Sequence, residues 1–276
     1  MILKNQKVVH ACMIGASVVS LFTVPSGTSA ETTMTQQCHA TSPLHFHSEC
    51  KIEAMDWGNN LFNLWDKLTP RIEKDIIRGY TAANYQTING YLRSEYFNPL
   101  DQEKVERSVK LMDRAFSRVR LQEDMIVYRR VSERSFGLKS GEFGELMNEE
   151  SRINMSAFET FKRLFQGKYK KDPTYISTSI VKDAAESFSH LPILMKIHIP
   201  KGVPAIYVAP LSHLPEEDEL LLPRNRTYKV TNILPVIEED REYIMLDIEI
   251  LDIASNYRNK RSNDIVYDDN LPSLSK

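Results

Sequence analysis

A run of four acidic residues, Glu216 to Glu219, stands directly before three leucines, Leu220 to Leu222. If a buried strand begins at Glu219, the side chains of Glu217 and Glu219 point to the same face of it. Two carboxylates side by side at the edge of a core could act as an acid/base pair or stabilise a developing cation. A solvated acidic turn before an ordinary strand is the simpler interpretation, and the run by itself favours it.

Two adjacent arginines, Arg129 and Arg130, interrupt an otherwise apolar and aromatic segment, 125–131, which has the composition of a strand. Alternation along a strand sends the two side chains to opposite faces, so one guanidinium is expected to point into the core or a cleft. There it would bind a phosphate or a carboxylate through two hydrogen bonds. A surface salt bridge explains the pair equally well.

Three small hydroxyl residues, Ser177, Thr178 and Ser179, end a short segment that begins at Tyr175. Ser177 and Ser179 share a face and could orient a neighbouring carboxylate or a ribose. Exposed strand faces also carry serine and threonine, and the triplet alone favours that interpretation. The sequence contains no glycine-rich phosphate loop, no Rossmann fingerprint and no Gly-x-Ser-x-Gly motif.

Taken in order, the arginine strand, the Ser-Thr-Ser strand and the Glu-x-Glu strand resemble those of the mono-ADP-ribosyltransferase toxins. The resemblance covers roughly residues 57–252. It points to the branch that includes the enzymatic components of actin-modifying clostridial binary toxins and their single-domain relatives. It implies NAD as a substrate, no metal, and a host protein bearing an arginine as acceptor, with actin favoured. A separate translocation component would be a further partner.

The resemblance implies a role for each candidate. Glu219 would hydrogen-bond the ribose 2′-hydroxyl and face the cation that forms when nicotinamide leaves, and Ser177 would hold Glu219 in place. Glu217 would engage the acceptor, because in the family a glutamate there accompanies arginine acceptors. Glu216 and Asp218 are expected to be the solvated half of the run. The NAD-binding candidates are Arg129 for the phosphates, Arg130 through its backbone, Tyr80, Tyr85, Asn89, Thr178, Ser179 and Phe188.

Two matches and two departures complete the comparison with the family. Tyr80, Tyr85 and Asn89 reproduce a Tyr-x4-Tyr-x3-Asn pattern on the helix that faces NAD, and Phe188 matches an aromatic in the loop over the nicotinamide. Leu191 stands where some relatives place an arginine, and 211–214 lacks an aromatic that helps to dock the target. The departures bear on target docking more than on NAD binding.

Three other functions stay open at this point. The same Glu219 could serve an enzyme that hydrolyses NAD without any protein target. A retaining glycosidase could use Glu217 and Glu219 as its pair, although Arg129 and Ser177 would then lack a role. A secreted binding module without enzymatic activity is the third.

The start of the chain indicates export. The 276 residues carry 35 Lys and Arg against 37 Asp and Glu. Residues 1–30 combine two lysines, an apolar run and a small-residue end, as in a signal peptide cleaved near Ala30. The run is short for a membrane anchor. Cleavage leaves 33 − 37 = −4 charges, which gives no electrostatic basis for binding nucleic acid. The product is expected outside the cell, and the resemblance implies action in a host cytosol.

The chain is expected to consist of the signal peptide, a polar arm over 31–52, a single ADP-ribosyltransferase catalytic domain over 53–253 and a flexible tail over 254–276. In an oxidising compartment Cys38 and Cys50 are expected to form one disulfide. Histidines lie near these cysteines, but their spacing fits no common zinc pattern.

Periodicity predicts how the candidates are positioned. Helices are predicted over 57–68, 70–93, 101–119 and 154–165, the second with Thr69 as N-cap and Pro70 at its first position. Strands are predicted at 125–131, 175–179, 193–199, 205–209, 219–222, 228–237 and 243–251. Helices first and closely spaced strands later predict an α+β fold with mainly antiparallel sheets. The resemblance refines this to N-terminal helices packed on a two-sheet β core of ADP-ribosyltransferase type.

Overall fold

The computed structural model describes residues 42–95, 98–139, 144–238 and 241–251. The chain divides into two units, residues 1–36 and 37–276, and every described residue belongs to the second. The predicted signal peptide, Cys38 and the predicted tail lie outside the described residues. Within those ranges, none of the helices has both the length and the apolar composition that crossing a bilayer requires.

The first half is helical, as predicted. Its helices are α1 (Lys51–Leu68), α2 (Arg71–Gly79), η2 (Tyr80–Asn84), α3 (Tyr85–Leu92) and α4 (Gln102–Phe116). The prediction of one helix over 70–93 is wrong at η2, a π-helical turn. A Cβ added at Gly79, directly before this turn, would come within 2.8 Å of Asn84 Nδ2, the end of a side chain in the turn.

The predicted start of the second helix is also wrong. Pro70 occupies the N-cap position of α2 and makes no side-chain cap hydrogen bond. The hydroxyl of Thr69 instead donates to the carbonyl of Trp65 at 2.6 Å, one turn back in α1. A threonine hydroxyl satisfies whichever backbone group its rotamer reaches, and here that group belongs to the preceding helix.

Eight strands form one sheet in the order β2-β7-β8-β4-β1-β3-β6-β5. All neighbours are antiparallel except the parallel pair β4–β8. The fold class is confirmed, but the expected two sheets are continuous, joined between β1 and β3 by the single pair Tyr128–Ser179. The strands are β1 (Met125–Val131), β2 (Tyr169–Asp172), β3 (Ile176–Ser179), β4 (Ile193–Ile199), β5 (Ile206–Tyr207), β6 (Glu219–Leu222), β7 (Arg226–Ile237) and β8 (Glu242–Ile250).

The remaining elements are α5 (Met155–Phe165), α6 (Lys182–Phe188) and the short 3-10 turns η1 (Ser48–Cys50), η3 (Pro99–Asp101), η4 (Glu133–Phe136) and η5 (Pro215–Glu217). The sequence did not predict α6 or β2. The latter, Tyr-Lys-Lys-Asp, is an edge strand with no buried residue, so it lacks the apolar alternation that identifies strands.

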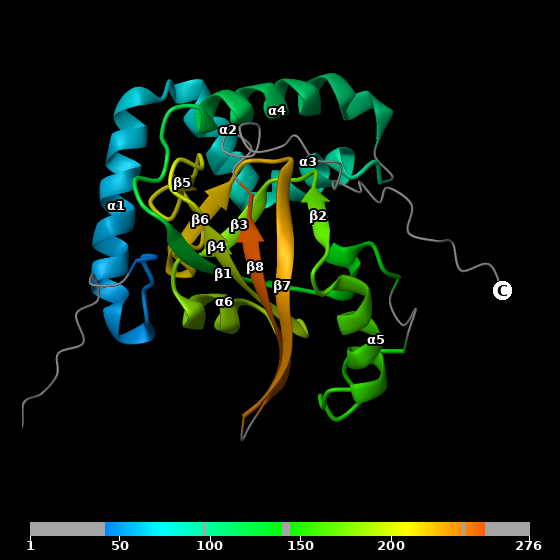
Figure 1. Ribbon diagram of the computed structural model, residues 1–276. Helices are drawn as coiled ribbons and strands as arrows, with labels where there is room; N and C mark the ends of the chain where they lie inside the picture. Colours follow the sequence, from blue (N-terminus) through cyan, green and yellow to red (C-terminus); the bar gives the residue numbers. More distant parts are fainter. Residues whose placement is uncertain (1–41, 96–97, 140–143, 239–240, 252–276) are drawn as a thin grey trace, which may run out of the picture. The chain divides into compact units, whose positions relative to one another are not determined.

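Helices cover the sheet from different sides. In Figure 1, α4 runs across the top, α1 lies on the left beside β5, α6 lies below the strands, and α5 lies at the lower right. One core cluster joins the N-terminal helices to the strands through residues such as Trp65, Tyr175 and Leu221. The last part of the predicted polar arm, from residue 42 onwards, is packed into the core. Leu44 and Phe46 are buried, and they form isolated β-bridges to Met125 and Val181 respectively.

Candidate active site

Glu219, the first residue of β6, forms the centre of the site. It pairs with Ser179 across the antiparallel β3–β6 ladder. Ser177, two residues earlier on the same face of β3, donates its hydroxyl to Glu219 Oε1. The glutamate is only 5% exposed, and this burial raises its pKa, while the Ser177 hydrogen bond and the positive charge of Arg129 lower it. The three groups therefore lie within reach of one another, as the order of the motifs predicted.

Glu217 approaches Glu219 by a different route from the one expected. It ends η5 rather than lying on β6, and Asp218 between them has a left-handed conformation with φ 47° and ψ 46°. Strand alternation therefore does not place these carboxylates. Burial, and then the negative charges of Glu219 and Glu216, raise the pKa of Glu217 to about 7. Near neutral pH this carboxyl group can both hold and accept a proton.

The two arginines of β1 face opposite ways, as predicted. The charge of Arg129 lowers the pKa of both Glu219 and Tyr80, so it lies on their side. Among the described residues, its Nη1 is buried without a hydrogen-bond partner. Arg130 donates from Nη1 to the carbonyl of Leu191 at 2.6 Å, and its guanidinium lies 5.0 Å from the centroid of Tyr243. Arg130 Nε is also buried without a hydrogen-bond partner among the described residues, but it belongs to the other face of β1, so Arg129 is the guanidinium on the side of Glu219 and Tyr80 that could bind a phosphate.

Tyr80, Tyr85 and Asn89 come together because of the π-helical turn. A turn with i to i+5 hydrogen bonds brings residues five apart onto nearly the same side. The rings of Tyr80 and Tyr85 accordingly meet edge to face, with centroids 6.5 Å apart. Asn89 Nδ2 donates to the Tyr80 hydroxyl at 2.9 Å, and Asn89 Oδ1 is buried with no partner among the described residues. Tyr85 is 43% exposed, so its ring remains available to a ligand.

Of the other NAD-binding candidates, Thr178 and Ser179 hydrogen-bond to backbone carbonyls, and Phe188 lies in a helix rather than in a loop. Thr178 Oγ1 donates to the carbonyl of Leu220 at 2.6 Å, and Ser179 Oγ donates to that of Val181 at 2.9 Å. Both hydroxyls therefore stabilise backbone around Glu219. Phe188 is the last residue of α6 and not part of a loop, so the loop expected over a nicotinamide begins one residue later.

Sequence inspection missed the residues that hold these elements in place. Asp218, expected to be solvated, is 1% exposed, and its Oδ1 accepts a hydrogen bond from the Tyr207 hydroxyl at 3.0 Å. Tyr175 Oη donates to Asp113 Oδ1 at 2.9 Å, and Arg224 donates to both oxygens of that carboxylate. Arg224 and Asp113 are 111 residues apart, and no local pattern signals such a pair.

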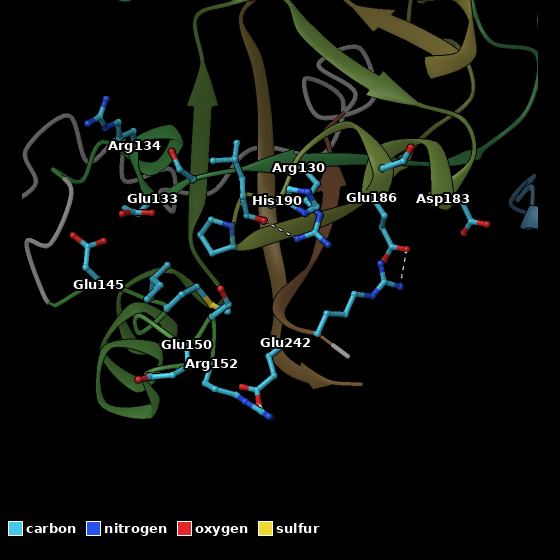
Figure 2. Close-up of a pocket in the computed structure, with 18 residues that line it drawn as sticks. Arg130, Glu133, Arg134, Glu145, Glu150, Arg152, Asp183, Glu186, His190 and Glu242 are labelled. Atoms are coloured by element: carbon cyan, nitrogen blue, oxygen red, sulfur yellow. Dashed lines mark hydrogen bonds and ion pairs between the residues drawn. The ribbon is translucent and has the colours of Figure 1, made fainter. Parts of the chain in front are cut away.

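A cavity of about 1200 Å³ lies on the Arg130 side of β1. Figure 2 shows Arg130, Asp183 and Glu186 along one side of it and Arg152 and Glu242 along another. Many of its charges are paired within the chain, as in Arg152–Glu242 at 2.7 Å. The residues that line this cavity include neither Ser177 nor Glu219. A large cavity is therefore not by itself a guide to the position of the candidate active site.

Two atoms of this region have the donor and acceptor character that a nucleotide would require. Two buried polar atoms without partners, Arg129 Nη1 and Asn89 Oδ1, offer a donor for phosphate and an acceptor for an amide or hydroxyl group. Within the described ranges, no group of three or more His, Cys, Asp or Glu side chains is arranged to bind a metal ion. The free donor and acceptor are of the kinds that the phosphates and the amide or hydroxyl groups of NAD would need.

Comparisons with known proteins agree with this fold and with the family that the three motifs resemble. The family model described as ADP-ribosyltransferase exoenzyme matches residues 54–252. The mono-ADP-ribosyltransferase C3 of Hathewaya limosa is 33% identical over 190 residues, covering 66% of this chain and 70% of that protein. The NAD(+)–arginine ADP-ribosyltransferase EFV of Enterococcus faecalis is 27% identical over 168 residues, which are 59% of this chain and 29% of that protein. The solved structure of Plx2a, an ADP-ribosyltransferase toxin from Paenibacillus larvae, has a TM-score of 0.66 and 29% identity, covering 73% of this chain and 96% of that one.

Proposed function

Because the chain belongs to the ADP-ribosyltransferase exoenzyme family, we propose that it is a secreted toxin or effector that transfers ADP-ribose from NAD to an arginine of a host protein. Family membership carries the general part of this statement, a mono-ADP-ribosyltransferase with NAD as substrate. Arginine as the acceptor is supported by Glu217 two residues before Glu219 and by the likeness to EFV.

The observation that carries the mechanism is the buried Glu219 with Ser177 bonded to it. When the bond between nicotinamide and ribose C1′ breaks, its electron pair leaves with nicotinamide and C1′ becomes oxocarbenium-like. The Glu219 carboxylate faces this charge as it develops, and stabilising a transition state more than the ground state accelerates the reaction. The hydrogen bond from Ser177 keeps the carboxylate oriented.

Glu217 supplies what an arginine acceptor needs. A guanidinium has a pKa above 12 and carries no free electron pair until it loses a proton. The new bond forms between an arginine nitrogen and C1′, and the proton passes to Glu217. A carboxylate whose pKa is raised to about 7 is a stronger base than an ordinary one and is still largely deprotonated slightly above neutral pH.

Two further parts of the proposal follow from the same chemistry. Water can replace arginine as the nucleophile, so NAD glycohydrolase activity is expected beside the transfer. The resemblance to actin-modifying toxins supports actin as the acceptor. An enzyme that only hydrolyses NAD is the alternative, since Glu219 and Ser177 would serve it unchanged.

Export is proposed from the first 30 residues, whose composition is that of a signal peptide. N-terminal sequencing of protein recovered from the culture medium is expected to begin at Glu31. A medium fraction that retains Met1, or no protein in the medium, would contradict it.

Nicotinamide release and labelling of lysate proteins from radiolabelled NAD test the enzymatic roles together. Glu219→Gln removes the charge that faces the cation, so both activities should fall by about 10² to 10³, the loss typical of one transition-state contact. Glu217→Gln should keep most nicotinamide release and lose arginine labelling. Glu103→Gln, at an exposed position of α4, is the matched control and should resemble wild type.

Three results would contradict the proposal. Undiminished nicotinamide release in Glu219→Gln would refute its role. Labelling that survives Glu217→Gln, or that hydroxylamine does not remove as it removes arginine-linked ADP-ribose, would refute arginine as the acceptor. Nicotinamide release by wild type without any labelled protein would favour the glycohydrolase.

A further inference from the structure

Asp218, between the two glutamates of the site, is itself turned into the protein. It is 1% exposed. Its Oδ1 accepts a hydrogen bond from Tyr207, and its Oδ2 is buried without a hydrogen-bond partner among the described residues. Burying a carboxylate this incompletely satisfied costs free energy. Such a residue at the centre of a catalytic motif indicates a positional role.

The hydroxyl that holds Asp218 is itself fixed by α1. Tyr207 is 1% exposed, and its ring lies against Gly58, where an added Cβ would come within 2.5 Å of Cζ. The backbone of Asp218 makes two further bonds: its carbonyl accepts from Ile180 N–H at 3.1 Å, and its N–H donates to the Pro215 carbonyl at 3.3 Å. Asp218 is therefore tied to β5, to the end of β3 and to η5.

The backbone conformation of Asp218 determines how Glu217 and Glu219 are placed relative to each other. Its φ of 47° lies in the left-handed region, which aspartate and asparagine tolerate better than most residues. Glu217 is the last residue of η5 and Glu219 is the first residue of β6, so Asp218 alone connects the two elements. The distance between the two glutamates therefore depends on the conformation of Asp218. The side chain of Glu219 accepts a hydrogen bond from Ser177, whereas Glu217 is tied to η5 through its backbone N–H, which donates to the carbonyl of Leu214 at 3.2 Å. The position of Glu217 thus depends on the turn.

We propose that Asp218, held by Tyr207, is a positioning residue that sets where Glu217 stands relative to Glu219, and thereby sets how much cleaved NAD passes to an arginine acceptor instead of water. The inference rests on the proposed roles of the two glutamates. Asp218 acts through the backbone turn, since its side chain is directed to Tyr207 and the core.

The test measures nicotinamide release and transfer to agmatine, a small guanidino acceptor, in parallel on the mature chain. Tyr207→Phe removes the hydroxyl and keeps the ring against Gly58. Asp218→Ala removes the acceptor and disfavours the left-handed backbone, whereas Asp218→Asn keeps an acceptor oxygen and tolerates that backbone. Asp218→Asn is therefore the conservative variant expected to rescue function.

We expect Tyr207→Phe and Asp218→Ala to lower the ratio of transfer to hydrolysis about tenfold or more, with nicotinamide release within about threefold of wild type, because misplacing a catalytic group by about 1 Å costs up to 10²-fold. Asp218→Asn should keep a ratio close to wild type. A ratio unchanged in both Tyr207→Phe and Asp218→Ala overturns the inference. So does an equal loss of both activities together with a lowered Tm, since that pattern marks a purely structural role.

Failure of the proposed function is recognisable separately. If wild-type protein releases nicotinamide but modifies neither agmatine nor any lysate protein, arginine transfer is refuted and the inference falls with it. If wild type transfers ADP-ribose to agmatine and the variants leave the ratio unchanged, only the role of Asp218 is refuted.

Discussion

At the scale of single residues, burial and two neighbours decide the chemistry of Glu219. Burial raises its pKa, and Ser177 and Arg129 act in the opposite direction. Burial has the largest effect, so the pKa of Glu219 is raised overall. When this carboxylate is charged, water screens it little, and an unscreened charge stabilises a nearby cation more strongly. The pKa of Glu217, two residues away, is raised by burial and by the like charges of Glu219 and Glu216. This difference in environment fits the separate roles that we propose for the two glutamates.

This difference predicts the pH dependence of transfer. The pKa of Glu217 is raised from its ordinary value to about 7, so the carboxyl group is mostly protonated below pH 7 and becomes a base above it. Transfer to agmatine at saturating NAD is expected to rise as pH increases through about 7 and then level off. Nicotinamide release in the absence of an acceptor should lack this step.

The variant Glu217→Gln provides the control, because its side chain does not titrate. Its residual transfer should show no step near pH 7. A wild-type profile that is flat between pH 6 and 8, or that falls as the pH rises, would show that Glu217 is not the base.

At the scale of elements, the packing of α1 on β5 holds Tyr207, which in turn hydrogen-bonds to Asp218 between the two glutamates. Gly58 is the residue of α1 against which the Tyr207 ring lies, and a Cβ there would meet three ring atoms at 2.5–2.6 Å. Gly58→Ala should therefore destabilise the protein by about 1–3 kcal/mol, the usual cost of overpacking a core. Urea denaturation followed by circular dichroism measures this free energy of unfolding.

A second helical glycine gives a matched control. At Gly90 in α3 the nearest atom to an added Cβ is Glu95 Oε2 at 3.7 Å, an ordinary contact. Gly90→Ala should leave stability unchanged or raise it by up to about 1 kcal/mol, because alanine favours the helix. Equal effects of the two substitutions would show that Tyr207 is not tightly packed on α1.

At the scale of the described unit, the site lies where the two halves of the sheet meet. Arg129 belongs to β1, Ser177 to β3 and Glu219 to β6, and β1 and β3 share only the pair Tyr128–Ser179. β1 pairs with β4 over its full length of seven residues. A ligand that contacts Arg129 and Glu219 together would span this narrow junction, so binding should be coupled to the stability of the fold.

We therefore expect NAD to stabilise the protein by about 2.7 kcal/mol at 100 times its Kd, from mass action. The thermal shift is measured in the Glu219→Gln variant so that NAD is not consumed. Adding Arg129→Met should remove most of this shift, whereas adding Arg107→Met, at an exposed position of α4, should not. An equal shift in both double variants would contradict a phosphate-binding role for Arg129.

The sequence by itself determined the family and the order of the elements. The order of the three strand motifs led to the ADP-ribosyltransferase toxins, and the family model confirms this. Strands 125–131, 193–199 and 219–222 were predicted to the residue, since each is a short apolar run with a clear break at its end. Composition and periodicity are properties of neighbouring residues, so they can be read without knowing what packs against them.

Only the tertiary structure decided how the site is held. The burial of Asp218, the edge strand β2 and the Arg224–Asp113 pair have no signature in the local pattern. The acidic run by itself favours a solvated turn, yet Asp218 is 1% exposed and Glu219 is 5% exposed, and the left-handed Asp218 lies between Glu217 and Glu219. Such outcomes depend on contacts between segments far apart in the chain, and on the backbone conformation of one residue, which hydrophobic periodicity does not encode.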